Sequence, residues 1–257
     1  KWSFATDGSV RFAPMIDGAR IYFGSDDGHV YCVDAATGTQ IWKYRPGPSG
    51  ERIIGNGRMI SLWPIRTGVL IEDGILYTTA GIFPYEGLYI AAVDAKTGKP
   101  IWVNDTAGDQ AWGLQYGGMS PQGYLVASAD TLFVPTGRSM PAAFNKRTGK
   151  FKRFLSGGGK IGGSWAMMDG NELFAGIGNQ GTDTKIAFDA KSGGSRGDQF
   201  SRYPSIDMVL TKDTAFIATQ KGIYSIDRAA NLKANSAVAA LDKESSTLAK
   251  SIVAIRK

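Results

Sequence analysis

Apolar and polar residues alternate along this chain in short runs, and turns that contain glycine separate the runs. The first set covers residues 11–16, 20–25, 29–35 and 40–45, with Asp-Gly-Ala, Asp-Asp-Gly and Ala-Thr-Gly between them. Alternation over about four to eight residues is typical of β-strands, and short glycine turns join antiparallel neighbours. The pattern therefore predicts a meander of four antiparallel strands.

The same arrangement returns along the chain as far as residue 231. Units of about 40 to 50 residues with four strands each are the signature of β-propeller blades. A lone blade cannot bury both faces of its sheet, so neighbouring blades must stack. The sequence predicts an all-β fold, a β-propeller of four-stranded antiparallel blades, with about five blades in this chain. The blades are expected at residues 5–45, 46–104, 105–155, 156–200 and 201–231.

One stretch of ten residues occurs twice in nearly the same form, as VDAATGTQIW and as VDAKTGKPIW. The aspartate can accept hydrogen bonds from the backbone that follows it, and the glycine can take the positive φ of a tight hairpin. The tryptophan offers a broad apolar face and one N–H donor. We predict that each copy builds a hairpin and fastens it to a neighbouring blade. The motif residues are Asp34, Thr37, Gly38, Trp42, Asp94, Thr97, Gly98 and Trp102.

These residues resemble the tryptophan-docking motif of the pyrroloquinoline-quinone-like (PQQ-like) β-propeller repeats. The third unit has Arg153 at the tryptophan position and the fourth has Gly197, so their junctions are expected to be fastened differently. The resemblance implies a ring of about seven or eight blades, of which this chain is a part. In an alternative arrangement, residues 1–4 complete the fifth blade and close a ring of five.

The last 26 residues, 232–257, lack the strand pattern. Their apolar residues fall at the a and d positions of a heptad, with Ser245 as the polar exception, which predicts an amphipathic helix. Fewer than three full heptads are present, so we expect a helical insertion or tail packed on the side of the propeller. No run approaches the length of about 20 apolar residues that a membrane span needs. The heptad residues are Val238, Leu241, Leu248, Ile252 and Ile255.

The chain has one cysteine, Cys32, and one histidine, His29, which leaves no internal disulfide and no Cys/His zinc site. His29 follows an Asp-Asp-Gly turn, where an exposed, non-catalytic position is expected. The resemblance extends to the quinoprotein alcohol dehydrogenases, whose site uses an adjacent cysteine pair, a carboxylate base and calcium. This chain has no adjacent cysteine pair. We therefore expect no catalytic residue, no metal and no cofactor in this chain.

The predicted function is that of a non-catalytic scaffold for protein or small-ligand binding. The resemblance implies that the chain is part of a larger bacterial protein that is periplasmic, on the cell surface or secreted. The alternative is a fragment of a PQQ-dependent dehydrogenase, with PQQ and calcium held by blades outside this chain. The expected partner is a protein or the rest of a larger polypeptide. The net charge of +6 is mostly spread along the sequence, without a recognised nucleic-acid motif, so no nucleic-acid partner is expected.

Three polar residues occupy the same place before the first hairpin of their units, namely Arg11, Arg66 and Gln122. First strands line the central channel of a propeller, so these side chains are predicted to share one rim. Two guanidinium groups and an amide suit a carboxylate or another anionic ligand. In the alternative interpretation, each arginine bonds carbonyl groups between blades or a neighbouring aspartate.

Overall fold

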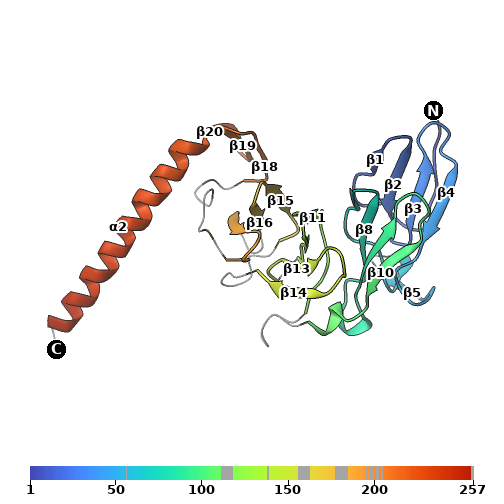
Figure 1. The fold of residues 1–257 in the computed structure, drawn as a ribbon, viewed down its shortest axis with the longest axis horizontal. Helices are drawn as coiled ribbons and strands as arrows, with labels where there is room; N and C mark the ends of the chain where they lie inside the picture. The colour runs from blue at the N-terminus through green and yellow to red at the C-terminus, as the bar shows by residue number, and fades with distance from the viewer. Residues whose placement is uncertain are drawn as a thin grey trace.

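The strands form successive small antiparallel sheets that follow one another along an arc, with the N-terminal and C-terminal sheets at opposite ends (Figure 1). This computed structural model describes residues 1–55, 57–110, 118–137, 139–155, 163–176, 185–194, 196, 200, 203 and 205–255, with side chains up to residue 251. The first sheet contains β1 (Met15–Asp17), β2 (Arg20–Gly24), β3 (Val30–Asp34) and β4 (Gln40–Tyr44).

Two more sheets repeat this four-stranded order. The second contains β7 (Leu70–Glu72), β8 (Ile75–Ala80), β9 (Tyr89–Asp94) and β10 (Pro100–Asn104). The third contains β11 (Val126–Ala127), β12 (Thr131–Val134), β13 (Ala142–Asn145) and β14 (Phe151–Phe154). The first strands are shorter than the sequence pattern predicts: β1 begins only at Met15, directly after Pro14, which has no N–H to donate to a ladder.

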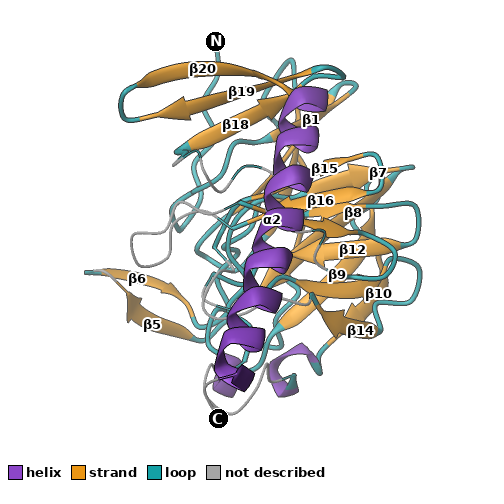
Figure 2. Ribbon diagram, turned by 90° about the vertical axis from the view of Figure 1, so that its left-hand side faces the viewer, coloured by secondary structure: helices purple, strands orange, loops and turns teal. Residues whose placement is uncertain are grey.

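The last two sheets have three described strands each. The fourth contains β15 (Ala166–Asp169), β16 (Glu172–Ala175) and β17 (Ile186–Asp189), and the fifth contains β18 (Asp207–Leu210), β19 (Thr214–Thr219) and β20 (Gly222–Asp227). Between the first and second sheets, β5 (Arg52–Gly55) and β6 (Arg58–Ser61) form a separate hairpin, visible apart from the sheets in Figure 2. Short 3-10 helices cover residues Pro84–Glu86 and Ala107–Asp109.

The core lies between the sheets and not within any one of them. Tyr22 and Leu76 pack in one apolar cluster between the first and second sheets, and Leu132 belongs to the cluster between the second and third. The next residue, Phe133, packs instead with Phe188 between the third and fourth sheets. Successive side chains of a strand point to opposite faces, so each strand serves two neighbours. The all-β propeller architecture predicted from the sequence is confirmed.

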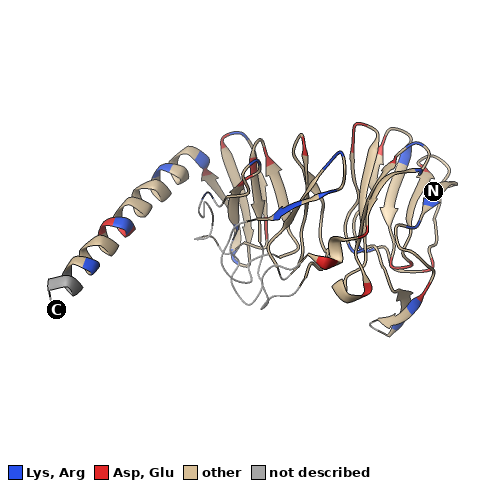
Figure 3. Cartoon of the chain, turned by 60° about the horizontal axis from the view of Figure 1, so that its bottom comes forward, with Lys and Arg blue, Asp and Glu red and all other residues tan. Residues whose placement is uncertain are grey.

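Helix α2 (Arg228–Ile255) follows β20 without a turn and extends away from the sheets (Figures 1 and 3). Asp227 accepts a hydrogen bond from the backbone N–H of Ala230 at 2.7 Å, which is the contact of a helix N-cap. The prediction that this helix packs on the side of the propeller is wrong: Leu241 and Leu248 are exposed. In the part of the chain that the structure describes, no helix is long and apolar enough to cross a membrane.

Residues 1–4 lie against the first sheet, far along the arc from β20 (Figure 1). Trp2 donates its indole N–H to the carbonyl oxygen of Ala35 at 3.0 Å, and the ring of Phe4 lies edge-on to that of Phe23. The fifth sheet is therefore not completed by this segment, and a closed ring of five blades is not formed.

Candidate functional site

A tryptophan crosses each of the first junctions between sheets. Trp42 of the first sheet donates its indole N–H to the carbonyl oxygen of Ala95 in the second sheet at 3.1 Å. Its ring lies so close to Gly98, which has a φ of 70°, that a β-carbon there would come within 2.6 Å of the ring. Trp102 makes the same contact one sheet further, with the carbonyl oxygen of Lys146 at 3.2 Å.

The aspartate of the motif organises the turn that receives the tryptophan. Asp94 Oδ1 accepts hydrogen bonds from both the hydroxyl and the backbone N–H of Thr97, each at 2.7 Å, and the corresponding bonds join Asp34 to Thr37. These bonds favour the ionised carboxylate, so the hydrogen bonds from threonine lower the pKa of both aspartates. The turn therefore presents its first carbonyl groups to the neighbouring sheet in a constant geometry.

The third junction uses a guanidinium group in place of the indole. Arg153 lies over Gly193 and donates from Nη2 to the carbonyl oxygens of Ala190 and Lys191. This is the different fastening that the loss of the tryptophan requires. Gly197, at the corresponding position of the fourth unit, lies outside the described residues.

Two of the three predicted rim residues meet on one buried carboxylate. Asp26, with a fully buried side chain, accepts from Nε of Arg11 at 2.7 Å and from Nε of Arg66 at 2.5 Å. The two arginines are 55 positions apart in the chain, and each precedes the first strand of its sheet. The contact joins the N-terminal segment, the first sheet and the entry to the second sheet.

Gln122 lies near the ion pairs of Asp26, because the residue after it, Gly123, is hydrogen-bonded to the backbone of Arg66. The N–H of Gly123 donates to the carbonyl oxygen of Arg66 at 3.3 Å, and that of Gly68 donates to the carbonyl oxygen of Gly123 at 2.9 Å. The exposed side chain of Gln122 donates to the hydroxyl oxygen of Ser120 at 3.1 Å. The three segments therefore adjoin, and the role of their side chains in ligand binding remains a prediction.

The histidine is not in the exposed position that the sequence suggested. Its side chain is 14% exposed, and Nδ1 lies 3.3 Å from Oδ1 of Asp27. The other carboxylate oxygen of Asp27 accepts from the Tyr31 hydroxyl at 2.7 Å. Burial raises the pKa of Asp27, but hydrogen bonds from His29 and Tyr31 outweigh it and lower that pKa to about 2. Burial and Asp27 together raise the pKa of Tyr31. This arrangement stabilises the turn between β2 and β3.

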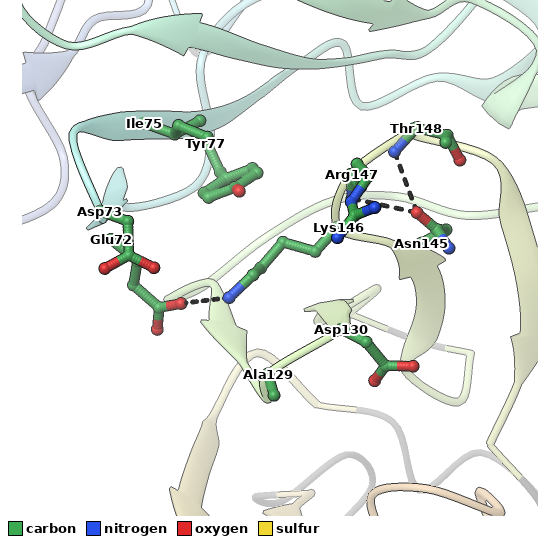
Figure 4. A pocket seen from close by; sticks show the side chains of 10 residues that line it. All are labelled: Glu72, Asp73, Ile75, Tyr77, Ala129, Asp130, Asn145, Lys146, Arg147 and Thr148. Carbon is green, nitrogen blue, oxygen red and sulfur yellow. Dashed lines mark hydrogen bonds and ion pairs between the residues drawn. The ribbon is translucent and has the colours of Figure 1, made fainter.

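A cavity of about 600 Å³ lies between the second and third sheets, beside the Trp102 junction. Its lining combines the turn after β7 with the turn after β13, and Lys146 spans it to bind Glu72 at 2.8 Å (Figure 4). Asp130, also on the lining, binds Lys152 at 3.0 Å, and that hydrogen bond lowers its pKa to about 2.

The tryptophan contacts, the ion pairs of Asp26 and the cavity are all built on a repeated blade. Comparison with known proteins shows the family of that repeat. A PQQ-repeat family model, described as outer membrane protein assembly factor BamB, matches residues 1–250. The chain belongs to this BamB family. Among solved structures, the BamB-family chain is similar to BamB from Moraxella catarrhalis, with a TM-score of 0.56 and 16% identity over 88% of this chain and 60% of that chain.

Enzymes appear among its relatives as well. Tetrathionate hydrolase from Acidithiobacillus ferrooxidans is 27% identical over 204 residues, which cover 75% of this BamB-family chain and 36% of that protein. A quinohemoprotein alcohol dehydrogenase from Pseudomonas putida HK5 has a TM-score of 0.60 and 20% identity, over 88% of this chain and 41% of that chain. This BamB-family chain thus spans about a third of the length of tetrathionate hydrolase.

Sequence reasoning missed Asp26 and the cavity of the BamB-family chain. Asp26 belongs to an Asp-Asp-Gly turn, whose acidic residues look like ordinary turn formers. Its partners are 15 and 40 positions away, so nothing local marks it. One alternative from the sequence did predict that each arginine bonds a neighbouring aspartate, but it did not identify Asp26 as that aspartate.

Proposed function

We propose that this chain is a non-catalytic propeller module that acts as a scaffold for protein or small-ligand binding in a bacterial envelope or secreted protein. Through its BamB family, we further propose a role in the assembly of outer-membrane proteins. One observation carries the proposal: the buried carboxylate of Asp26 holds Nε of both Arg11 and Arg66. These two ion pairs therefore join separate segments of the scaffold to each other.

The residues present do not fit the site that a quinone cofactor with calcium would need. Both oxygens of the buried Asp26 carboxylate accept from Arg11 and Arg66, so this carboxylate is not available as a calcium ligand or as a catalytic base. In the described part of the chain, no group of three or more His, Cys, Asp or Glu side chains is placed to hold a metal ion. We derive no reaction step from these residues.

A small anionic ligand at the rim is compatible with the same geometry. Arg11 and Arg66 each spend Nε on Asp26, and their terminal amino groups have no hydrogen-bond partner among the described residues. The Arg11 side chain is 36% exposed, so its amino groups are accessible to a ligand. Two guanidinium groups on one carboxylate leave a net positive charge, which favours a carboxylate ligand.

The outer face of the fifth sheet supports a protein contact. Val209 and Phe216 are direct cross-strand partners, and Ile223 lies on the same face, two residues from the partner of Phe216. All three side chains are exposed, with Ile223 at 77%. Contiguous exposed apolar side chains mark interaction surfaces. We propose that a partner protein or the rest of a larger polypeptide covers this face.

Two assays on the full-length protein test this proposal. The first adds PQQ and calcium, then records quinone absorbance and dye reduction with alcohols. We expect no bound quinone and no dye reduction, and calcium-dependent dye reduction would overturn the non-catalytic assignment. The second measures complex formation with purified outer-membrane assembly proteins of the same bacterium by analytical ultracentrifugation. A stable complex is expected, and its absence with every component would contradict the assembly role.

The rim is tested separately with citrate as the anionic probe. Isothermal titration should detect citrate binding to the unsubstituted protein and at least tenfold weaker binding to Arg11→Ala. The affinity of Arg11→Lys, which keeps the charge, should lie between these two. Unchanged citrate affinity in Arg11→Ala and in Arg66→Ala would contradict the ligand role.

A further inference from the structure

Two junctions between blades place a guanidinium group on the same backbone carbonyl. In the first, Arg20 Nη1 of the first sheet donates to the carbonyl oxygen of Lys96 at 2.7 Å, and lies 3.3 Å from that of Ala95. In the third, Arg153 Nη2 donates to the carbonyl oxygens of Lys191 and Ala190. Lys96 and Lys191 are both the second residue after the motif aspartate. This carbonyl is therefore a recurrent acceptor for arginine.

The second junction has the acceptor but no arginine on it. The position of Arg20, which pairs with Asp34, is taken in the second sheet by Ile75, which pairs with Asp94. The counterpart of the Lys96 carbonyl is that of Arg147, which accepts no hydrogen bond from any residue that the structure describes. Ile75 and Arg147 both line the cavity of about 600 Å³. The cavity thus lies where the first junction has its guanidinium group.

A tyrosine hydroxyl faces the same cavity. In the first sheet, Tyr22 donates its hydroxyl hydrogen to the carbonyl oxygen of Ala95 at 3.1 Å. Its counterpart is Tyr77, two residues after Ile75, whose side chain points from β8 into the cavity (Figure 4). Within the described ranges its hydroxyl has no hydrogen-bond partner. The hydroxyl is therefore available to a ligand as an acceptor.

Two carboxylates complete the acceptor set, at the turn after β7. Glu72 binds Lys146 through Oε2 and keeps Oε1 available, and Asp73 makes no ion pair with the described residues. Figure 4 shows both beside the cavity, opposite the turn that carries the free carbonyl. Lys146 occupies one oxygen of Glu72, so Oε1 of Glu72 and the carboxylate of Asp73 are the acceptors that stay available. The Arg147 side chain is exposed.

We propose that this cavity is a binding site for an arginine side chain of a partner protein. A guanidinium group has five N–H donors in one plane, so it can bind the Arg147 carbonyl and a carboxylate at the same time. An ammonium group is a compact charge and cannot match these separated acceptors equally well. The proposal rests on the proposed function as a protein-binding scaffold, and it specifies the partner's contact residue.

The test titrates N-acetyl-arginine amide, with N-acetyl-lysine amide as the comparison, and follows backbone amide shifts by NMR. We expect the arginine probe to shift the amides of Ile75, Tyr77 and Arg147, with the lysine probe at least about fivefold weaker. Ile75→Arg should place a guanidinium group of the chain's own in the cavity, as Arg20 does at the first junction. It should weaken the arginine probe at least tenfold and raise Tm by about 2 °C.

Ile75→Leu is the matched control, because it keeps an apolar side chain of the same size and should bind the arginine probe as the unchanged protein does. Equal binding of the two probes, no binding, or full binding to Ile75→Arg would each overturn the proposal. The complex measured for the proposed function separates the two ideas. A partner that still binds Ile75→Arg refutes the arginine site and leaves the scaffold standing. Arginine binding without any partner refutes the scaffold role alone.

Discussion

Trp42 and Trp2 make the same contact at two successive places, so replacing each by alanine measures what burial adds to it. Each indole N–H donates to the first carbonyl after a motif aspartate, at 3.1 Å for Trp42 and 3.0 Å for Trp2. Each ring lies over the glycine of the receiving turn, Gly98 or Gly38. The two residues differ in exposure, which is 8% for Trp42 and 39% for Trp2.

The difference in burial sets the expected difference in stability. The exposed fractions differ by 31 percentage points, 39% less 8%, which on an aromatic side chain of up to about 250 Å² is about 80 Å². At about 25 cal/mol per Å², this area corresponds to about 2 kcal/mol. A buried tryptophan replaced by alanine costs about 3–5 kcal/mol. We therefore expect about 4 kcal/mol for Trp42→Ala and about 2 kcal/mol for Trp2→Ala.

The measurement is equilibrium unfolding in urea at 25 °C, followed by far-UV circular dichroism because the substitutions change the fluorescence. The m values should agree between variants, so that the free energies of unfolding can be compared. Trp42→Phe keeps most of the ring and removes the donor, and should cost about 1–2 kcal/mol. A loss for Trp2→Ala that equals or exceeds that of Trp42→Ala would refute the reasoning from burial.

Three further predictions concern the turns. Gly98→Ala should lower the free energy of unfolding by at least about 2 kcal/mol, more than Gly74→Ala, because both glycines have φ near 70° but only Gly98 has a ring within 4 Å; equal losses in urea unfolding would contradict the contact. Asp26→Asn should cost about 3 kcal/mol in the same assay, since it removes the partner of two guanidinium groups, and no loss would argue against its structural role. Asp27 has a pKa lowered from 3.8 to about 2, so it contributes about 2 kcal/mol above pH 4 that is lost as the pH falls through 2; Asp27→Asn should flatten the stability curve over that window, and an unchanged slope would exclude this linkage.

The blade and its turn could be predicted because their determinants are local. Asp94, Thr97 and Gly98 act within five residues, and strand alternation is readable in any window. The partner of each arginine could not be predicted, because Asp26 is one of two adjacent acidic residues in an ordinary turn. Only the folded backbone shows that Asp26 faces the arginines while Asp27 binds His29 and Tyr31.

The C-terminal helix shows a different limit of the sequence. Asp94 and Asp227 both accept a hydrogen bond from the backbone N–H three residues on. At Asp94 the Thr-Gly pair turns the chain back, because glycine takes a positive φ. After Asp227 the chain continues with Arg-Ala-Ala, and the same hydrogen bond starts a helix. The helix was predictable, but its direction away from the sheets depends on where β20 ends.

A repeat provides controls within one molecule, and this decides how the second junction should be interpreted. Three junctions present the same backbone carbonyls in the same turn, and the first and third meet them with Arg20 and Arg153. The turns match, so the missing partner of the Arg147 carbonyl follows from two side chains and not from a change of backbone. Ile75 stands at the position of Arg20, and Trp102 stands at the position of Arg153. Tryptophan still fastens this junction through Lys146, so stability does not require an arginine there. A fastened junction that keeps a free acceptor and a cavity is therefore a place where an added arginine is expected to bind.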